Sequence, residues 1–244
     1  MKIVAIIPAR YASERFPGKP LALIKGRPMI QHVYLRAKKS PTLEKVVVAT
    51  DDERIKRAVE EIGGESLMTS PSHRCGTERI AEAADLLRLS EDDIVVNIQG
   101  DQPLLEPVVI EELVRPLLLK SEILMATLAV PIKREEEKDD PNRVKVVLDR
   151  EGFALYFSRA PIPFHRPPGE SPVYLRHIGL YAYRRDFLDV FVRLEPGELE
   201  KAEKLEQLRA LEYGYRIAVS ITKYDFPEVD TPEDLKRVEE LMTK

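Results

Sequence analysis

Short apolar runs alternate with helical patterns along the first half of the chain, and this alternation restricts the fold more than any other feature. Residues 2–8 (KIVAIIP) form a β-branched run that ends at a proline, which is typical of a strand buried on both faces of a parallel sheet. Further strands are predicted at 46–49 and 94–98, and helices at 28–39, 53–62, 76–87 and 107–119. Such alternation indicates right-handed βαβ units.

The rhythm changes after about residue 121, where strands follow one another with fewer helices between them. Strands are predicted at 124–132, 144–148, 153–157 and 178–183, with a hairpin at Gly152 and a proline-rich loop at 161–172. The last elements are one charged helix at 199–213, a strand at 215–221, and a helix at 232–242 capped by Thr231. We therefore expect a single domain over 1–244 with a mixed sheet or an inserted lobe at about 124–210.

Composition excludes several classes of protein. The chain has 244 residues, with 38 Lys and Arg against 42 Asp and Glu, and 43% of its residues are hydrophobic. It can bury a core, and its slight negative charge argues against nucleic acid as a partner. A lone cysteine, Cys75, cannot form an intrachain disulfide, and no apolar run approaches the roughly 20 residues of a membrane span. We expect a cytoplasmic protein without a membrane partner.

The loop after the first strand is rich in basic side chains. Residues 8–20 (PARYASERFPGKP) carry Arg10, Arg15 and Lys19 together with the hydroxyl of Ser13. Ligands of open α/β sheets bind beyond the carboxyl ends of the strands, and guanidinium and ammonium groups suit a polyphosphate. The loop matches neither GxxxxGK[ST] nor GxGxxG. The alternative is a solvated loop whose charges pair with surface carboxylates.

Two aspartates are candidates for a metal site. Asp101 follows the strand at 94–98 in the sequence QGDQP, and Asp230 precedes the last helix. Carboxylates at strand ends suit Mg²⁺, although Asp101 could instead form a turn and Asp230 could compete with Thr231 as the helix cap. Together with the basic loop, they predict a magnesium-bound nucleoside triphosphate rather than a redox cofactor.

Motifs along nearly the whole chain resemble one enzyme family. In order, they are IIPARYASERFPGKPL, ATDD, SHRCGTERIAEA, VNIQGDQP, VKVVLD, ALYFSRAPIP, RHIGLYAYRRDF, LEKAEKLEQLRALEYG and VDTPEDL. This series is similar to the 3-deoxy-manno-octulosonate (Kdo) cytidylyltransferases, or CMP-Kdo synthetases. The resemblance implies a nucleotide-diphospho-sugar transferase-like α/β fold, with a mostly parallel sheet flanked by helices, a smaller dimerisation lobe and a homodimer. It also implies Mg²⁺-assisted transfer of CMP from CTP to the anomeric hydroxyl of Kdo for lipopolysaccharide biosynthesis.

The resemblance also implies roles for individual residues. The metal ligands would be Asp101 and Asp230, which with Lys19 and Arg10 form the catalytic set. The residues implied to bind CTP are Pro8, Ala9, Arg10, Ser13, Arg15, Lys19, Cys75 and Gly76. Those implied to surround Kdo are Arg79, Gln99, Arg159, His177 and Glu206. Because Kdo is an acid sugar with many hydroxyls, arginine, amide, imidazole and carboxylate groups suit it.

Structural alternatives exist for the sugar-side residues. Arg79 and Glu206 could be solvated ion pairs on charged helices, His177 a satisfied structural imidazole, and Gln99 a strand-end cap. Two positions depart from the family: Gln102, where Glu is frequent, and Arg74-Cys75, where polar uncharged residues are common. These departures leave open a role for Gln102 at the metal and a base-side contact for Cys75.

Rival functions share much of this sequence pattern. One is a cytidylyltransferase for a sialic or related acid sugar, or another nucleotidyltransferase with the same basic loop. Another is a nucleotide-binding protein without catalysis, against which the presence of both Asp101 and Asp230 argues. For the expected homodimer, an apolar set could supply the contact or could equally be core: Phe187, Leu188, Val190 and Phe191.

Overall fold

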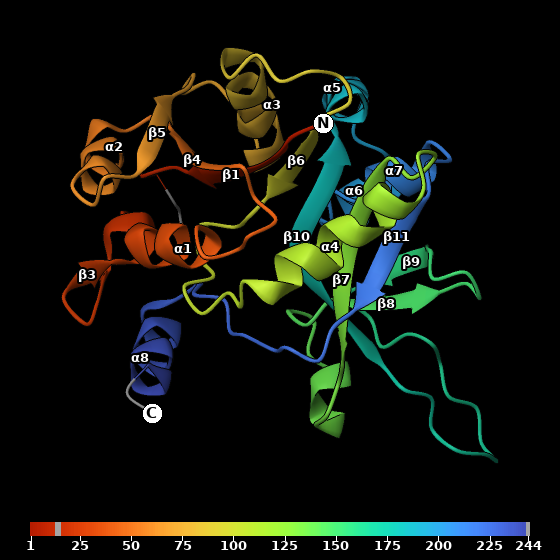
Figure 1. Ribbon diagram of the computed structural model, residues 1–244. Helices are drawn as coiled ribbons and strands as arrows, with labels where there is room; N and C mark the ends of the chain where they lie inside the picture. Colours follow the sequence, from red (N-terminus) through yellow and green to blue (C-terminus); the bar gives the residue numbers. More distant parts are fainter. Residues whose placement is uncertain (13–15, 243–244) are drawn as a thin grey trace. The chain divides into compact units, whose positions relative to one another are not determined.

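The computed structural model describes residues 1–12 and 16–242. The chain divides into two compact units. The first unit comprises Met1–Glu111, Arg184–Val192 and the chain from Phe226 onward, and the second comprises Glu112–Tyr183 and Arg193–Asp225. Figure 1 labels the elements of both. A dimerisation or sugar-binding role for residues 124–210 stays a prediction.

A parallel sheet is the centre of the first unit. Its strand order is β6-β1-β4-β5, and every neighbouring pair in this set is parallel. The strands are β1 (Ile3–Ala9), β4 (Lys45–Thr50), β5 (Glu65–Met68) and β6 (Ile94–Asn97). Val4 to Ile7 of β1 are buried because they have strands on both edges and helices on both faces. The βαβ pattern predicted for this half is confirmed.

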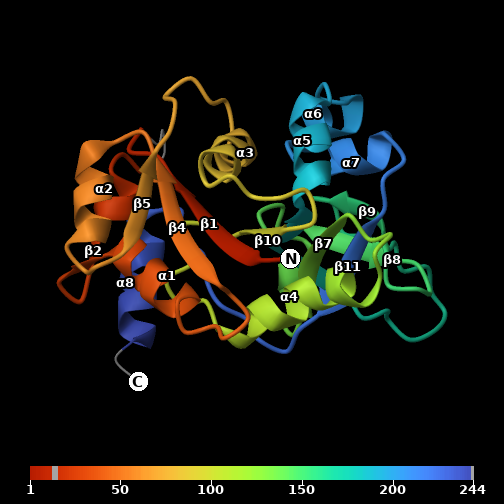
Figure 2. The same cartoon turned by 45° about the horizontal axis from the view of Figure 1, so that its top comes forward.

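Helices cover both faces of this sheet. Figures 1 and 2 show α3 (Gly76–Leu86) on one face and α1 (Met29–Ala37) with α2 (Glu53–Glu60) on the other. Pro28 was predicted inside the first helix, but it is the N-cap residue, since its ψ of 137° is extended. Asp52 caps α2 by accepting a hydrogen bond from the Arg54 N–H at 2.9 Å. The other helices of the unit are α5 (Arg185–Arg193) and α8 (Pro232–Leu241).

A mixed sheet forms the second unit, as the closely spaced strands predict. β7 lies parallel to β11 and antiparallel to β10, while β8 pairs antiparallel with both β9 and β10. The strands are β7 (Met125–Pro131), β8 (Lys145–Leu148), β9 (Ala154–Ser158), β10 (Leu175–Arg184) and β11 (Ile217–Ile221). Gly152, with φ of 85°, makes the predicted hairpin turn between β8 and β9.

The charged segment at 199–213 contains two short helices, so the prediction of one helix is wrong. They are α6 (Glu198–Glu203) and α7 (Leu208–Glu212). Lys204 ends α6 in the left-handed conformation, with φ of 55° and ψ of 46°, which interrupts the helical hydrogen bonds. Helix α4 (Val108–Leu119) spans the boundary between the units and contains Pro116.

Several short elements were not predicted. These are β5, α5, the two-residue strands β2 (Leu23–Ile24) and β3 (Arg27–Pro28), and the 3₁₀ helices η1 (Lys19–Leu21) and η2 (Glu135–Lys138). Among the described residues, none of the helices has the length and apolar character needed to cross a membrane.

The apolar residues considered for a dimer contact are mostly core. On α5, Phe187, Leu188 and Phe191 are at most 2% exposed, whereas Val190 is 40% exposed. The core alternative therefore holds for the first three. The homodimer itself stays a prediction.

Candidate functional site

The structure brings Lys19, Asp101 and Asp230 together in the first unit. The Lys19 ammonium lies 2.7 Å from Asp101 Oδ2 and 3.4 Å from Asp230 Oδ1. Gly18 places Lys19 there: its left-handed φ of 72° starts the 3₁₀ helix, and its N–H bonds to Tyr11 O at 2.9 Å. The basic loop thus folds back so that one of its cations meets two carboxylates from distant parts of the chain.

Asp101 is positioned by the close approach of two strand ends. It follows Gly100, where a Cβ atom would lie 3.2 Å from Pro8 O and 3.6 Å from Ile30 Cδ1. Because β6 and β1 are parallel neighbours, their carboxyl ends meet at one edge of the sheet. A Cβ atom would make this approach tighter than usual, so glycine suits the position, and the turn brings Asp101 next to the end of β1.

Asp230 is not the cap of α8. The Thr231 hydroxyl accepts from the Asp234 N–H at 3.2 Å, and the Asp234 carboxylate accepts from the Thr231 N–H at 2.9 Å. This capping box leaves the Asp230 carboxylate directed at Lys19. The Val229 N–H also bonds to Asp101 O at 2.9 Å, so the two acidic segments are joined through their backbones.

Charge in this cluster favours a cation. Burial opposes the charge of Lys19, but attraction from Asp101 and Asp230 outweighs it, so the pKa of Lys19 lies above its ordinary value. Two carboxylates that converge on one ammonium have the donor chemistry for Mg²⁺. The described residues contain no group of three or more His, Cys, Asp or Glu side chains suited to a metal. Further ligands would therefore come from phosphate oxygens and water, as is usual for Mg²⁺.

Residues predicted to line the nucleotide lie along the same edge. Pro8 is half-buried, Ala9 is buried, and Arg10 is exposed. A Cβ atom at Gly76 would lie 3.3 Å from Pro8 Cγ, so the start of α3 adjoins the end of β1. Cys75 is the half-buried N-cap residue of α3, and its side chain makes no capping hydrogen bond. The predicted residues Ser13 and Arg15 lie outside the described residues.

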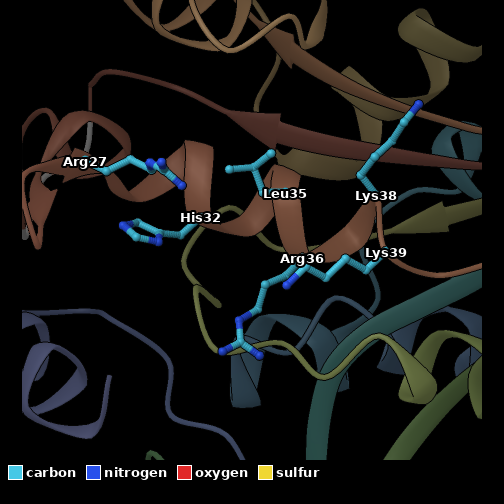
Figure 3. Close-up of a pocket in the computed structure, with 6 residues that line it drawn as sticks. All are labelled: Arg27, His32, Leu35, Arg36, Lys38 and Lys39. Atoms are coloured by element: carbon cyan, nitrogen blue, oxygen red, sulfur yellow. The ribbon is translucent and has the colours of Figure 1, made fainter. Parts of the chain in front are cut away.

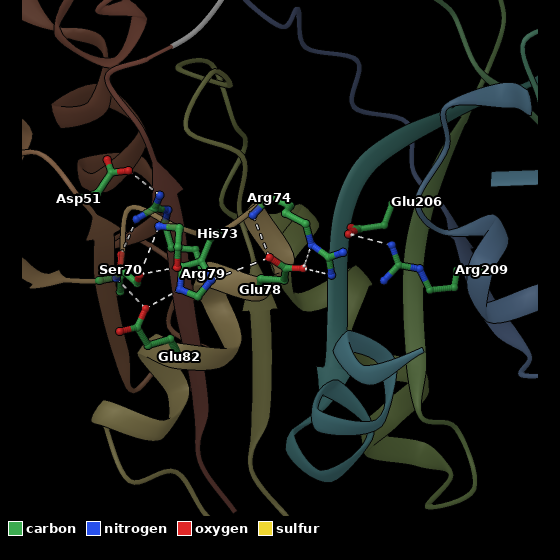
Figure 4. Close-up of polar contacts among 11 residues, drawn as sticks. Asp51, Ser70, His73, Arg74, Glu78, Arg79, Glu82, Glu206 and Arg209 are labelled. Carbon is green, nitrogen blue, oxygen red and sulfur yellow. Dashed lines mark hydrogen bonds and ion pairs between the residues drawn. The ribbon is translucent and has the colours of Figure 1, made fainter. Parts of the chain in front are cut away.

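Arg79 and Gln99, predicted on the sugar side, have partners within the first unit. Arg79 is 3% exposed, and its guanidinium pairs with Asp51 at 2.8 Å and donates to Thr69 Oγ1 at 2.5 Å (Figure 4). The alternative of a solvated surface pair is wrong for Arg79, because the guanidinium is buried. Gln99 Nε2 donates to Asn97 Oδ1 at 3.3 Å.

A carboxylate network that the sequence analysis missed orders the loop before Cys75. Glu82 accepts from the Ser70 N–H at 2.8 Å and bonds to His73 Nε2, while Glu78 accepts from the Arg74 N–H at 2.8 Å (Figure 4). Both acids stand on α3 one turn apart. The sequence did contain a signal for this network: Glu78 and Glu82 are four residues apart in the predicted helix at 76–87, so they lie on one face of it.

Arg159 and Glu206 belong to the second unit. The Arg159 guanidinium donates to Glu203 O at 2.7 Å and to Pro141 O at 2.9 Å. Its own carbonyl accepts from the buried ammonium of Lys145 at 2.7 Å. Glu206 lies 3.8 Å from the Arg209 guanidinium, which Figure 4 also shows. These contacts fix the backbone around Arg159.

His177 is held inside the second unit. Its Nε2 lies 2.9 Å from Thr127 Oγ1, which also lies 2.7 Å from Leu180 O. A hydroxyl that donates to the carbonyl must accept from Nε2–H, so Nε2 carries the proton. Burial lowers the pKa of His177 to about 3, with a smaller effect from Arg176. His177 is therefore a neutral, structural imidazole, and a sugar contact stays a prediction.

His177 makes the stability of the fold depend on pH. Because its folded pKa of about 3 lies below the ordinary 6.5, the unfolded chain binds the proton first as the pH falls, and stability is lost between these values. From pH 7.5 to pH 5, the loss from this group should be about 2 kcal/mol. The free energy of unfolding, measured with urea at several pH values, should therefore fall more steeply between pH 7.5 and pH 5 in wild type than in His177→Asn. If the free energy of unfolding changed equally with pH in wild type and His177→Asn, a buried neutral His177 would be contradicted.

A separate basic cavity lies along α1 of the first unit. Its volume is about 500 Å³, and its lining contains none of the predicted site residues (Figure 3). The lining residues are Arg27, His32, Leu35, Arg36, Lys38 and Lys39. Arg36 is tied to Glu106 at 3.1 Å. The cluster of Lys19, Asp101 and Asp230 and this cavity are thus different places.

Comparison with known proteins decides the family. The family model described as cytidylyltransferase matches residues 4–217. The chain belongs to the cytidylyltransferase family. It is therefore a nucleotidyltransferase, as predicted.

Individual relatives confirm the predicted resemblance to the Kdo cytidylyltransferases. An 8-amino-3,8-dideoxy-manno-octulosonate cytidylyltransferase of Shewanella pealeana is 57% identical over 244 residues, which are 100% of this chain and 99% of the relative. A 3-deoxy-manno-octulosonate cytidylyltransferase of Syntrophus aciditrophicus is 56% identical, over 99% of this chain and 97% of the relative. A solved CMP:2-keto-3-deoxy-manno-octonic acid synthetase in complex with CTP has a TM-score of 0.93 at 43% identity, covering 100% and 99% of the two chains. The predicted nucleotide-diphospho-sugar transferase-like fold is thereby confirmed.

Proposed function

We propose that this cytidylyltransferase transfers CMP from CTP to the anomeric hydroxyl of Kdo and releases pyrophosphate. The observation that carries the proposal is the convergence of Lys19, Asp101 and Asp230 at the carboxyl ends of β1 and β6. The solved synthetase at 43% identity holds CTP, which supports CTP as the nucleotide. A homodimer and a cytoplasmic location belong to the same proposal.

The first unit supplies the nucleotide side of the site. Pro8, Ala9 and the Cys75-Gly76 turn line the nucleotide, and the start of α3 adds backbone N–H donors. Arg10 and Lys19 bind phosphate oxygens, and Ser13 and Arg15 are assigned to the same role from the sequence alone. Asp101 and Asp230 hold Mg²⁺, which when bound neutralises phosphate charge and makes the α-phosphorus easier to attack.

The reaction is a direct displacement at the α-phosphorus. The anomeric oxygen of the sugar forms a bond to the α-phosphorus, the bond to the oxygen that bridges to the β-phosphate breaks, and the hydroxyl proton is released. Pyrophosphate carries away the negative charge of that bridging oxygen. Arg10, Arg15 and Lys19 stabilise the departing charge, and positioning of the two substrates supplies much of the rate.

The sugar-side assignment rests on residues suited to an acid sugar. Arg159 is the residue that we propose to bind the Kdo carboxylate, whereas the assignment of Arg79, Gln99, His177 and Glu206 to the sugar rests on the sequence alone. Arg159 has five guanidinium N–H donors, and its contacts with the carbonyl oxygens of Glu203, Pro141 and Lys204 use only part of them. The remaining N–H groups can bind the sugar carboxylate.

An amino sugar is the second candidate acceptor. The relative at 57% identity is named for 8-amino-3,8-dideoxy-manno-octulosonate, whereas the relative at 56% is named for Kdo. These sugars differ at C8, where an amine replaces a hydroxyl. The two identities are too similar to separate the candidates, so a direct comparison of acceptors is required.

Pyrophosphate release and product mass test the acceptor. Purified chain, CTP and Mg²⁺ are combined with Kdo, the 8-amino sugar or a sialic acid. The proposal predicts a CMP-Kdo product by mass spectrometry and the highest kcat/KM with Kdo. A higher kcat/KM with the 8-amino sugar would transfer the assignment to that sugar, and activity only with sialic acid would overturn both.

Arg159→Ala should weaken sugar binding. Loss of a hydrogen bond to a charged group costs about 1.5–3 kcal/mol, so we expect roughly a tenfold or larger increase in the KM for Kdo with little change in the KM for CTP. Initial rates with each substrate varied provide the measurement. Arg134→Ala, which removes an exposed arginine of the same unit, is the control. Equal changes in both KM values would refute the sugar-side role.

A further inference from the structure

Gln102 is buried beside Asp101 and makes one long-range hydrogen bond. Its side chain is 0% exposed, and its Nε2 donates to Glu228 Oε1 at 3.0 Å. A carboxylate can only accept a hydrogen bond, so the amide nitrogen must face Glu228. The carbonyl oxygen of Gln102 is buried without a hydrogen-bond partner in the described structure.

The bond joins the two segments that carry the acidic residues of the candidate site. Gln102 directly follows Asp101, and Glu228 lies two residues before Asp230. Between them, the Val229 N–H bonds to Asp101 O at 2.9 Å. Two neighbouring hydrogen bonds thus tie the turn after β6 to the segment before α8. Two such bonds restrict rotation as well as separation of the segments, which a single bond cannot do.

The same geometry sets where the two carboxylates point. Asp101 and Asp230 both reach the Lys19 ammonium, so their spacing already suits one shared cation. Asp230 is not the cap of α8, so the position of its backbone depends on neighbouring contacts. One is the bond from the Asp230 N–H to the Asp234 carboxylate at 3.1 Å, and another is the bond between Gln102 and Glu228.

We infer that Gln102 and Glu228 are positioning residues that hold Asp101 and Asp230 at the spacing needed to bind a divalent cation with the nucleotide. This inference rests on the proposed function. Neither side chain needs to touch the cation. Glu228 acts through its oxygen as an acceptor rather than through its charge, which separates this role from that of an additional metal ligand.

Variants at the exposed end of the pair give the test, because Glu228 is exposed and its replacement leaves the core intact. Glu228→Ala removes the acceptor, whereas Glu228→Gln keeps an acceptor oxygen and removes the charge. The probe is Mn²⁺ with CTP in the absence of a sugar, with free Mn²⁺ measured by electron paramagnetic resonance. We expect roughly tenfold weaker Mn²⁺ binding in Glu228→Ala, which is the low end of the effect of removing residues that orient metal ligands, and near wild-type binding in Glu228→Gln.

Two further variants complete the design. Glu233→Ala removes the same charge from an exposed site on the first turn of α8, and should bind Mn²⁺ as wild type does. Gln102→Met removes the donor while keeping an unbranched side chain. If Gln102 and Glu228 act through their mutual bond, the Gln102→Met/Glu228→Ala double variant should bind no more weakly than the weaker single variant.

The outcomes separate this inference from the proposed function. Unchanged Mn²⁺ binding in Glu228→Ala overturns the inference, and so does equal weakening in Glu228→Ala and Glu228→Gln, which would show that the charge matters. Additive losses in the double variant also overturn it. Asp101→Asn is measured in parallel: if it binds Mn²⁺ normally, the metal assignment fails, whereas weak binding in Asp101→Asn with normal binding in Glu228→Ala defeats the inference alone.

Discussion

Replacing Asp101 with asparagine is expected to lower kcat by on the order of 10²–10³, because the role proposed for Asp101, to hold a metal that neutralises the reacting phosphate, contributes several kcal/mol to the transition state. The fold should be retained, since asparagine has the same shape and can still accept from the Lys19 ammonium 2.7 Å away. Steady-state rates with saturating CTP and Kdo, together with a thermal melting curve, provide the measurement.

The control for Asp101→Asn is Asp92→Asn, which removes the same charge from an exposed position just before β6. This control should retain the wild-type kcat. A folded Asp101→Asn enzyme with near wild-type kcat would exclude Asp101 as a metal ligand and would leave the acidic cluster with a structural role only.

Lys19→Met is expected to lower kcat/KM for CTP by on the order of 10²–10³, because it removes a charged donor from the phosphates both in the bound state and in the transition state. Its effect on the metal should have the opposite sign. The Lys19 ammonium lies 2.7 Å from Asp101 Oδ2 and 3.4 Å from Asp230 Oδ1, so a cation that binds both carboxylates must compete with it. Lys19→Met should therefore bind free Mn²⁺ more tightly than wild type does.

The prediction for Lys19→Met is specific because kcat/KM for CTP should fall while the affinity for free Mn²⁺ rises. Steady-state kinetics gives the loss with CTP, and electron paramagnetic resonance of Mn²⁺ without nucleotide gives the gain. Lys38→Met, which removes an exposed lysine after α1, should change neither value. Weaker binding of both CTP and free Mn²⁺ in Lys19→Met would indicate a collapsed site and would contradict the assigned role.

The parallel half of the fold could be predicted because its strands are short, buried and separated by amphipathic helices. Strand β5 was missed, since its sequence Glu65–Met68 is half-exposed and half polar. Helix α5 starts at Arg185, directly after β10 ends at Arg184, so no turn residue marks the change. The segment at 199–213 was wrongly predicted as one helix because the break comes from the left-handed conformation of Lys204. Lysine rarely adopts that conformation, so the sequence gives no sign of the break.

The candidate site could be predicted where it follows from topology. Asp101 and Lys19 were predicted because each lies in a loop that leaves a buried strand, and the structure shows that these two strands are parallel neighbours. Side chains with distant partners could not be assigned in this way. Arg79 is buried and pairs with Asp51, 28 residues away. His177 is kept neutral mainly by burial, and its ring bonds to Thr127, 50 residues away. The bond between Gln102 and Glu228 spans 126 residues, and only the folded structure reveals it.

Pyrophosphate release with Kdo as the acceptor and each of CTP, UTP, ATP and GTP as the donor tests the proposed function most directly. Release should require CTP, Kdo and Mg²⁺ together, and it should stop when the metal is removed by a chelator. Comparable release with another nucleotide, or with CTP in the absence of any acid sugar, would contradict transfer of CMP to Kdo.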